Sequence, residues 1–239
     1  MTRVHVSETL VAGQALELPP AAAHHVAQVL RLAAGAALVL FDGTGGEYDA
    51  VLETVERRSV RVRVGAHRAV ERESALCLTL AQCVSKGERM DYTIQKAVEL
   101  GVTRIQPVLS ARSVVKLDAA RWAKKREHWL GVIASACEQC GRNRVPELAP
   151  AVPLSKWLAT RHGLCLVLVP MAQVGLRTLA RVSAVSLLVG PEGGLSEDEI
   201  AEAQAAGCTA IHLGPRVLRT ETAGVATLAA LQALWGDLG

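Results

Sequence analysis

The chain has 239 residues, of which 50% are apolar and 21% charged, so it can bury a sizeable core and is not intrinsically disordered. Its longest apolar runs, such as residues 164–169, fall well short of the roughly 20 residues of a membrane-spanning helix. The net charge of +3 is uneven, since residues 86–144 hold 12 Lys and Arg against 6 Asp and Glu. This excess favours a polyanionic partner, although a solvated basic face explains it equally well.

The first 70 residues are predicted to be rich in β-structure. An apolar run at 37–41, a glycine-rich turn at 42–46 and a further strand at 47–55 predict a hairpin. Residues 59–64 alternate between Val and Arg, as in a strand with one buried face, and a short helix is expected at 21–30. The polar stretch 66–74 is interpreted as a linker. We therefore expect a small barrel over residues 1–72 and a second domain over 73–239.

After the linker, strands and helices are predicted to alternate. Buried strands are expected at 76–84, 105–109, 164–169, 186–189 and 210–213. Helices are expected at 88–100, at 118–139, from Ser196 onward and at 220–235. Ser196 and Glu199 have the spacing of a capping box. This order predicts an α/β domain with a mostly parallel sheet covered by helices.

Two glycine-bearing loops each follow a predicted buried strand. They read GPEGGL at 190–195 and LGPRVLRTET at 213–222. In an open α/β sheet ligands bind beyond the carboxyl ends of the strands, so both loops could line one pocket; ordinary turns remain the alternative. Neither loop has the spacing of a phosphate-binding motif. A nucleotide-like ligand without a pyrophosphate is the better fit.

Together with three further strings, these loops resemble the ribosomal RNA small-subunit methyltransferase E family. The strings are HHV at 24–26, KGERM at 86–90 continuing into TIQK at 93–96, and ACEQCGRNRVP at 136–146. The resemblance implies a SPOUT-type trefoil-knotted α/β domain preceded by a small PUA-like β-barrel that grips RNA. It implies a homodimer that binds S-adenosylmethionine and methylates N3 of a uridine in 16S rRNA of the small ribosomal subunit. One departure is Val169-Pro170-Met171, where the family often has a His-Pro pair.

Site residues follow from the resemblance and from the two loops. Arg219 is expected to stabilise the uridine anion, with pairing to Glu221 as the alternative, and Glu138 and Glu221 are candidates for acid–base catalysis. The residues expected to bind the cofactor are Val169, Leu188, Val189, Gly190, Glu192, Gly194, Leu213, Gly214, Val217, Leu218, Thr222 and Ala223. The residues expected to contact RNA are Arg3, Arg31, Lys86, Arg142, Asn143 and Arg144.

Several other features have a structural interpretation. The pair Cys137 and Cys140 lacks a second metal-binding pair, so a structural role is favoured over zinc or redox chemistry, and no metal is expected. His24 and His25 are assigned to packing or RNA contact. With no secretory signal at the N-terminus, the six cysteines are expected to be free thiols of a cytoplasmic protein.

Two rival functions remain open at this stage. One is an RNA-binding assembly factor with a decayed cofactor pocket, against which the intact glycines argue. The other is a related knotted enzyme that methylates a tRNA ribose, against which the family strings argue. Independently of the resemblance, the small residues of the last helix favour a homodimer; they are Ala226, Ala229, Ala230 and Ala233.

Overall fold

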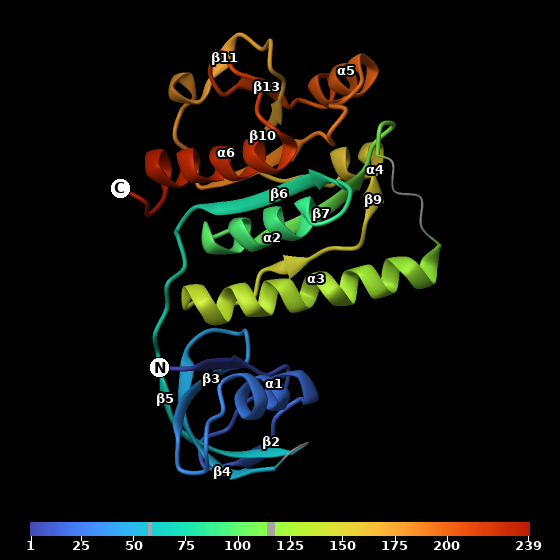
Figure 1. Cartoon of the computed structure of the whole chain (residues 1–239). Coiled ribbons are helices and arrows are strands. Elements are labelled where there is room, and N and C mark those ends of the chain that lie inside the picture. Colours follow the sequence, from blue (N-terminus) through green and yellow to red (C-terminus); the bar gives the residue numbers. More distant parts are fainter. Residues whose placement is uncertain (57–58, 114–117) are drawn as a thin grey trace. The chain divides into compact units, whose positions relative to one another are not determined.

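The computed structural model describes residues 1–56, 59–113 and 118–239, shown as a ribbon in Figure 1. These residues form two compact units, which consist of Met1–Glu73 with Ala134–Val145 and of Ser74–Ile133 with Pro146–Gly239. Helix α3 (Ala119–Cys140) contributes residues to both units. The expected division at residue 72 therefore misses one segment, because residues 134–145 pack with the N-terminal unit.

The N-terminal unit is built on a five-stranded sheet in the order β1-β3-β4-β5-β2. β1 pairs with β3 in parallel and the other pairs are antiparallel, including the predicted hairpin of β3 and β4. Val60, Val62 and Val64 are buried while Arg61 and Arg63 are exposed, which confirms the predicted alternation. The strands are β1 (Arg3–His5), β2 (Ala15–Glu17), β3 (Ala37–Phe41), β4 (Glu47–Val55) and β5 (Val60–Arg68).

The helix predicted at 21–30 is present in two parts. α1 (Pro20–His24) begins with a proline at its first position and continues as a π-helix, η1 (His25–Val29). The polar stretch 66–74 is not a linker throughout, because β5 extends to Arg68. The strand continues there because residues 67 and 68 pair with Tyr48 and Glu47 of β4.

The C-terminal unit contains an eight-stranded sheet in which every recorded pairing is parallel. The order is β11-β13-β10-β12-β6-β7-β8, and β9 also pairs with β7. This confirms the predicted α/β architecture. The strands are β6 (Cys77–Cys83), β7 (Arg104–Leu109), β8 (Glu147–Leu148), β9 (Val152–Pro153), β10 (Leu164–Leu168), β11 (Val174–Gly175), β12 (Ala184–Val189) and β13 (Thr209–His212).

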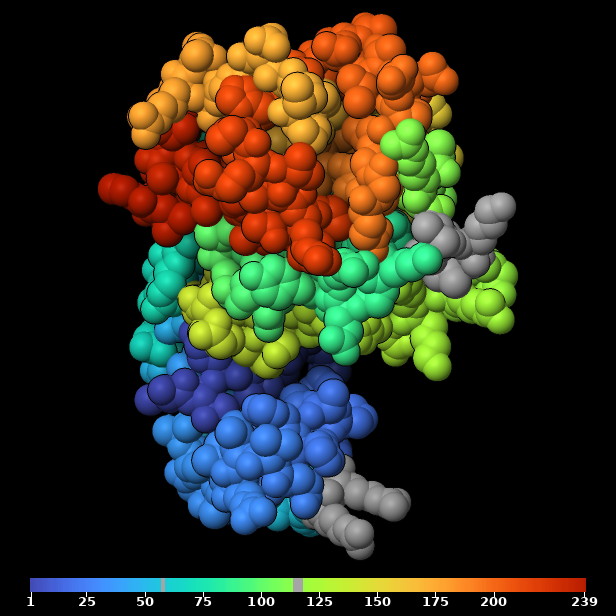
Figure 2. All heavy atoms as spheres, turned by 45° about the horizontal axis from the view of Figure 1, so that its top comes forward, coloured from blue at the N-terminus to red at the C-terminus, as the bar shows by residue number. Residues whose placement is uncertain are grey.

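Helices cover both faces of this sheet. On one face α4 (Leu154–Leu158) and α5 (Glu197–Ala205) pack against residues such as Cys83 and Leu188. On the other face α6 (Thr220–Trp235) packs against α2 (Arg89–Glu99) and places Gly224 next to Leu80 and Val189. Figure 2 shows residues of α6, coloured red, on the surface of this unit. Within the described ranges, no helix has the length and apolar character needed to span a membrane.

One cysteine prediction is wrong. Cys165 in β10 and Cys208 just before β13 form a disulfide, with their Cα atoms 4.5 Å apart. They are 43 residues apart in sequence, but β10 and β13 are parallel neighbours in which Leu166 lies opposite Thr209. Cys165 and Cys208 each come one residue before this pair, so the register places the two cysteines next to each other. Since this register is a property of the sheet, cysteine spacing alone does not reveal it.

Candidate active site

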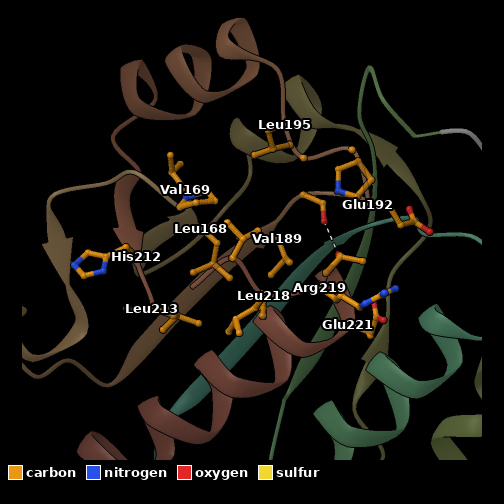
Figure 3. Close-up of a pocket in the computed structure, with 18 of the residues that line it drawn as sticks. Leu168, Val169, Val189, Glu192, Leu195, His212, Leu213, Leu218, Arg219 and Glu221 are labelled. Carbon is orange, nitrogen blue, oxygen red and sulfur yellow. Dashed lines mark hydrogen bonds between the residues drawn. The ribbon is translucent and has the colours of Figure 1, made fainter. Parts of the chain in front are cut away.

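A pocket of about 500 Å³ lies at the carboxyl ends of three neighbouring strands, β13, β10 and β12. The chain turns into the pocket after Leu168 of β10, after Val189 of β12 and after His212 of β13 (Figure 3). The two glycine-bearing loops singled out in the sequence therefore line one cavity, as expected for ligand sites in parallel sheets.

Ten of the twelve residues expected to bind the cofactor line this pocket. Of the other two, Leu188 points to the opposite face of β12 from Val189 and is buried against α4 and α5, because side chains alternate along a strand. Thr222 is exposed on α6, and its backbone N–H donates to the carbonyl of Arg219. The ten are Val169, Val189, Gly190, Glu192, Gly194, Leu213, Gly214, Val217, Leu218 and Ala223.

The pocket walls combine apolar side chains with closely approaching backbone. Leu168, Leu195 and Ile211 are among the apolar residues that line it. A Cβ added at Gly190 would lie 2.9 Å from the backbone N of Leu195, so the loop cannot close around any larger residue there. The Thr220 hydroxyl donates to the Gly190 carbonyl at 2.6 Å, the bond drawn in Figure 3, and so ties α6 to this loop.

Three charged side chains form a linked group at the pocket. The Arg89 guanidinium is 2.9 Å from Glu192 Oε1 and 3.7 Å from Glu221 Oε1. The backbone N–H of Lys86 donates to the same Glu192 oxygen at 2.9 Å. Burial alone would raise the pKa of the Glu192 carboxyl, but the hydrogen bonds from Lys86 and Arg89 outweigh it and lower that pKa. The sequence analysis assigned no role to Arg89, although the KGERM string contains it.

Arg219 lines the pocket and is exposed. Within the described ranges its side chain has no hydrogen-bond or ion-pair partner, and the ion pair at Glu221 is made by Arg89. The alternative in which Arg219 braces the loop through Glu221 is therefore not observed. Glu221 Oε2 is buried and has no hydrogen-bond partner among the described residues. The Arg219 guanidinium is thus available to a ligand, whereas Glu221 Oε2 is enclosed by the protein.

Glu138 does not line this pocket and belongs to the N-terminal unit. Its Oε1 accepts a hydrogen bond from the backbone N–H of His5 at 2.9 Å. Burial raises the pKa of the Glu138 carboxyl, and the hydrogen bond from His5 only partly offsets this effect. Glu138 therefore lies outside this pocket, and its carboxylate is held by the backbone of the N-terminal unit.

Three of the residues expected to contact RNA have internal partners instead. Arg142 is 4% exposed and donates to Glu73, with its Nε at 3.0 Å from the carboxylate. Asn143 is fully buried; it donates to the Val70 carbonyl at 2.6 Å and accepts from Arg3. Arg3 also pairs with a carboxylate of β4. Direct RNA contact by these three residues is not supported. A buried guanidinium that leaves its carboxylate, or a buried amide that leaves its carbonyl, would lose the partner that offsets the cost of its burial.

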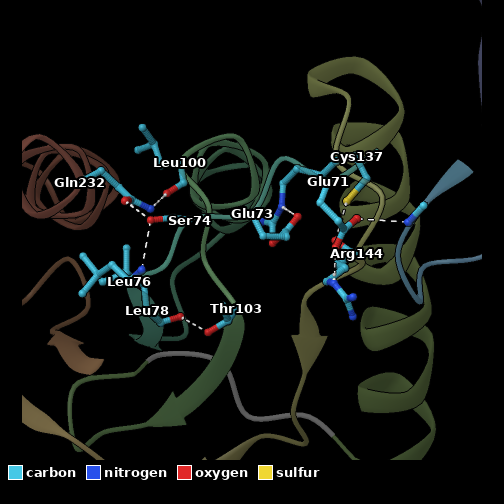
Figure 4. A network of polar contacts seen from close by, with 12 residues as sticks. Glu71, Glu73, Ser74, Leu76, Leu78, Leu100, Thr103, Cys137, Arg144 and Gln232 are labelled. Carbon is cyan, nitrogen blue, oxygen red and sulfur yellow. Dashed lines mark hydrogen bonds and ion pairs between the residues drawn. The ribbon is translucent and has the colours of Figure 1, made fainter. Parts of the chain in front are cut away.

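Arg31, Lys86 and Arg144 remain exposed and available to a polyanion. Arg144 pairs with Glu71, and both side chains keep substantial exposure, at 56% and 38% (Figure 4). Arg31 adopts a φ of 52°, in the left-handed region that few side chains occupy.

The CxxC pair is mainly internal. The Cys137 thiol is buried and lies 3.9 Å from the Arg144 carbonyl, and burial raises its pKa to about 12. Cys140 is half-buried. Within the described ranges, no group of three His, Cys, Asp or Glu side chains is placed to hold a metal ion. His24 and His25 are exposed, which leaves RNA contact open for both.

Comparison with known proteins agrees with this architecture. Residues 72–232 match the family described as RNA methyltransferase domain, and residues 18–65 match the RNA methyltransferase PUA domain. The ribosomal RNA small subunit methyltransferase E of Buchnera aphidicola subsp. Schizaphis graminum is 33% identical over 239 residues, which cover 99% of this chain and 97% of that protein.

Two solved structures cover the chain almost completely. A methyltransferase from Legionella pneumophila, determined with the bound cofactor SAM, has a TM-score of 0.97 and 44% identity and covers 99% of both chains. The ribosomal RNA small subunit methyltransferase E from Neisseria gonorrhoeae, bound to S-adenosyl methionine, has a TM-score of 0.92 and 39% identity and covers 100% of both chains.

Proposed function

The chain belongs to the ribosomal RNA small subunit methyltransferase E family, and from this we propose that it methylates N3 of a uridine in 16S rRNA with S-adenosylmethionine as the donor. The observation that carries the proposal is the pocket at the ends of three strands. Ten of the residues that were expected from the sequence to bind the cofactor line this pocket. The two solved relatives with this fold that hold the same cofactor support it.

The pocket fits S-adenosylmethionine in size and chemistry. Its volume of about 500 Å³ lies in the range of pockets for small ligands. Leu168, Val189 and Leu218 offer apolar surface to a base, and an added Cβ at Gly194 would meet nothing within 4 Å, so this position is open. The lining holds both signs of charge, with Glu192 and Glu221 negative and Arg89, Arg216 and Arg219 positive, which suits a ligand that carries both an ammonium or sulfonium and a carboxylate.

The residues around the pocket have separate tasks in this reaction. When bound, S-adenosylmethionine supplies a methyl group that its sulfonium charge already activates. The protein must align the uridine, accept its N3 proton and stabilise the anion that develops as the N3 lone pair bonds to the methyl carbon. Arg219 is suited to stabilise the uridine anion because its guanidinium is always charged and has no internal partner among the described residues. Glu221 is the candidate to accept the proton because it is a carboxylate residue that lines the pocket.

The remaining expectations belong to the same proposal. Residues 1–72 would act as the RNA-gripping domain, and Arg31, Lys86 and Arg144 would be the exposed RNA contacts of the chain. The C-terminal domain would carry a trefoil knot, and the enzyme would work in the cytoplasm without a metal. It would also be a homodimer, which the partly exposed small residues Ala226, Ala229 and Ala230 support. Light scattering after gel filtration measures this, and a monomer at micromolar concentration would contradict it.

The test of the central proposal is product analysis. Purified protein is incubated with labelled S-adenosylmethionine and small ribosomal subunits that lack the modification, and the modified base is identified by mass spectrometry. We expect one methylated uridine, at N3. Gly194→Trp should abolish both cofactor binding and methylation, because a side chain at this φ of +69° strains the glycine-bearing loop and the indole takes up the open space beside it. Methylation of a ribose, or tight RNA binding without any transfer, would favour one of the rival functions.

A further inference from the structure

The turn formed by residues 110–113 lies outside the pocket but contacts one of its loops. It follows β7, and Arg112 reaches from it to the glycine loop, which we define as residues 190–195. Arg112 Nη1 donates to the Gly193 carbonyl at 2.8 Å and lies 3.4 Å from the Leu195 carbonyl. Arg112 is not among the residues that line the pocket, so a ligand there would meet the glycine loop and not this side chain.

A second tie joins the same turn to the segment after the loop. Glu199 is 9% exposed, and its Oε1 accepts from the backbone N–H of Ala111 at 2.7 Å. Its other oxygen accepts from the backbone N–H of Ser196 at 2.8 Å and completes the capping box of α5. One carboxylate therefore holds the turn and the end of the glycine loop together.

The turn is itself well defined. The backbone N–H of Ser110 donates to the Ser113 hydroxyl at 3.1 Å, and the backbone N–H of Ser113 donates to the Ser110 carbonyl at 3.0 Å. Arg112 and the N–H of Ala111 thus project from a hydrogen-bonded support that is attached to β7, a strand paired on both sides.

The glycine loop needs such an external support. Three of its six residues are glycines, which lose more backbone entropy on ordering than any other residue. Its internal backbone hydrogen bond runs from the Gly194 N–H to the Pro191 carbonyl at 2.9 Å. Arg112 binds the carbonyls on either side of Gly194, so it restrains the peptide planes at the most permissive point of the loop.

We propose that Arg112 is a positioning residue for cofactor binding, which holds the glycine loop in its binding conformation through the Gly193 and Leu195 carbonyls. The proposal rests on the proposed function insofar as the ligand is S-adenosylmethionine. It assigns a role to the segment after β7, which no motif in the sequence analysis included.

The experiment compares Arg112→Met with Arg112→Lys and with a matched control, Arg121→Met. Arg121 is an exposed arginine of the same unit that pairs with Asp118 three residues away. Calorimetry measures the affinity for S-adenosylmethionine and for the product S-adenosylhomocysteine. We expect Arg112→Met to weaken both ligands about tenfold, as the loss of one or two charged hydrogen bonds implies, with partial rescue in Arg112→Lys and no change in the control.

A second readout separates positioning from general stability. Hydrogen exchange on the ligand-free protein should be faster in Arg112→Met at the amides of the glycine loop and unchanged in α6. Faster exchange throughout the C-terminal unit would overturn the proposal, as would unchanged affinity. A change in the affinity for S-adenosylmethionine without a matching change for S-adenosylhomocysteine would also overturn it, because Arg112 would then act on the sulfonium charge and not on the loop.

Failure of the proposed function has a different signature. If the wild-type chain binds neither ligand, the cofactor assignment is wrong, whereas the exchange of the glycine-loop amides still decides whether Arg112 holds the loop. Glu199→Gln gives an independent check, because a glutamine keeps one acceptor oxygen for two backbone N–H groups. We expect it to speed loop exchange in the same amides as Arg112→Met.

Discussion

Two arginines of the N-terminal unit and two of the C-terminal unit differ in what they bind. In the N-terminal unit Arg3 and Arg142 are largely buried and pair with carboxylates of the same unit. In the C-terminal unit Arg216 and Arg219 line the pocket, and neither side chain has a partner among the described residues. A guanidinium that is already matched by a carboxylate contributes to the fold, whereas one that faces a pocket without a partner is available to a ligand.

This difference changes how the string GRNR at 141–144 is understood. Its charge and its place after a helix suggest an RNA contact, yet two of its polar residues hold the segment 70–73 in place. Arg144 alone keeps a side chain that is more than half exposed. Within this short motif, the degree of burial and not the residue type distinguishes Arg142, which is tied into the fold, from Arg144, which is exposed to a ligand.

The largest expected effect tests this separation directly. Arg142→Met should lower the free energy of unfolding by about 3 kcal/mol, because it leaves the Glu73 carboxylate without its buried partner. Arg144→Met should cost about 1 kcal/mol or less, since its ion pair with Glu71 is exposed. Urea unfolding measures both. Equal losses would mean that the two neighbouring arginines do not differ as the structure indicates.

Arg219→Lys tests the pocket side of the comparison. We expect cofactor affinity close to that of the wild type and a loss of at least about tenfold in turnover, or about 1.4 kcal/mol of transition-state stabilisation. The rate should rise with pH as more uridine ionises, and alkaline conditions should partly rescue the variant. If affinity and turnover fall together, Arg219 supports the loop and does not act on the substrate.

A smaller effect is expected from the exposed arginines of the N-terminal unit. If Arg31 or Arg144 neutralises an RNA phosphate, replacing it with Ala should reduce the slope of log affinity for RNA against log salt by about one unit. Cofactor affinity should not change. Arg63→Ala is the control, because its exposed guanidinium pairs with Glu53 on the neighbouring strand. The same slope in all variants would assign RNA binding to another surface.

The smallest effect concerns Glu138. Because burial raises its pKa in the folded protein, the native state favours the protonated carboxyl, and the ionised form becomes a cost as the pH rises through that raised pKa. Glu138→Gln should therefore be slightly more stable than the wild type at pH 8 and show no gain at pH 4. Turnover should be unchanged. A large loss of turnover at normal cofactor affinity would restore Glu138 as a catalytic residue.

The local structure and the place of the site follow from residues that are neighbours in the chain. The helix predicted at 220–235 has those bounds, the capping box at Ser196 forms, and both glycine loops line the pocket. These features depend on residues that are close in the chain, where the spacing of apolar side chains, caps and glycines acts directly. The order of strands and helices then implied a parallel sheet, and a parallel sheet places its ligands beyond its carboxyl edge.

The pairings between distant residues depend instead on how the strands and helices are arranged in space. The disulfide of Cys165 and Cys208 depends on the register of two parallel strands. The burial of Arg142 depends on its ion pair with Glu73, which belongs to the other chain segment of the same unit. Arg89 joins the pocket because α2 lies against α6. In each case the partner is more than 40 residues away in the chain, so its identity depends on sheet order and helix packing, which residue spacing does not encode.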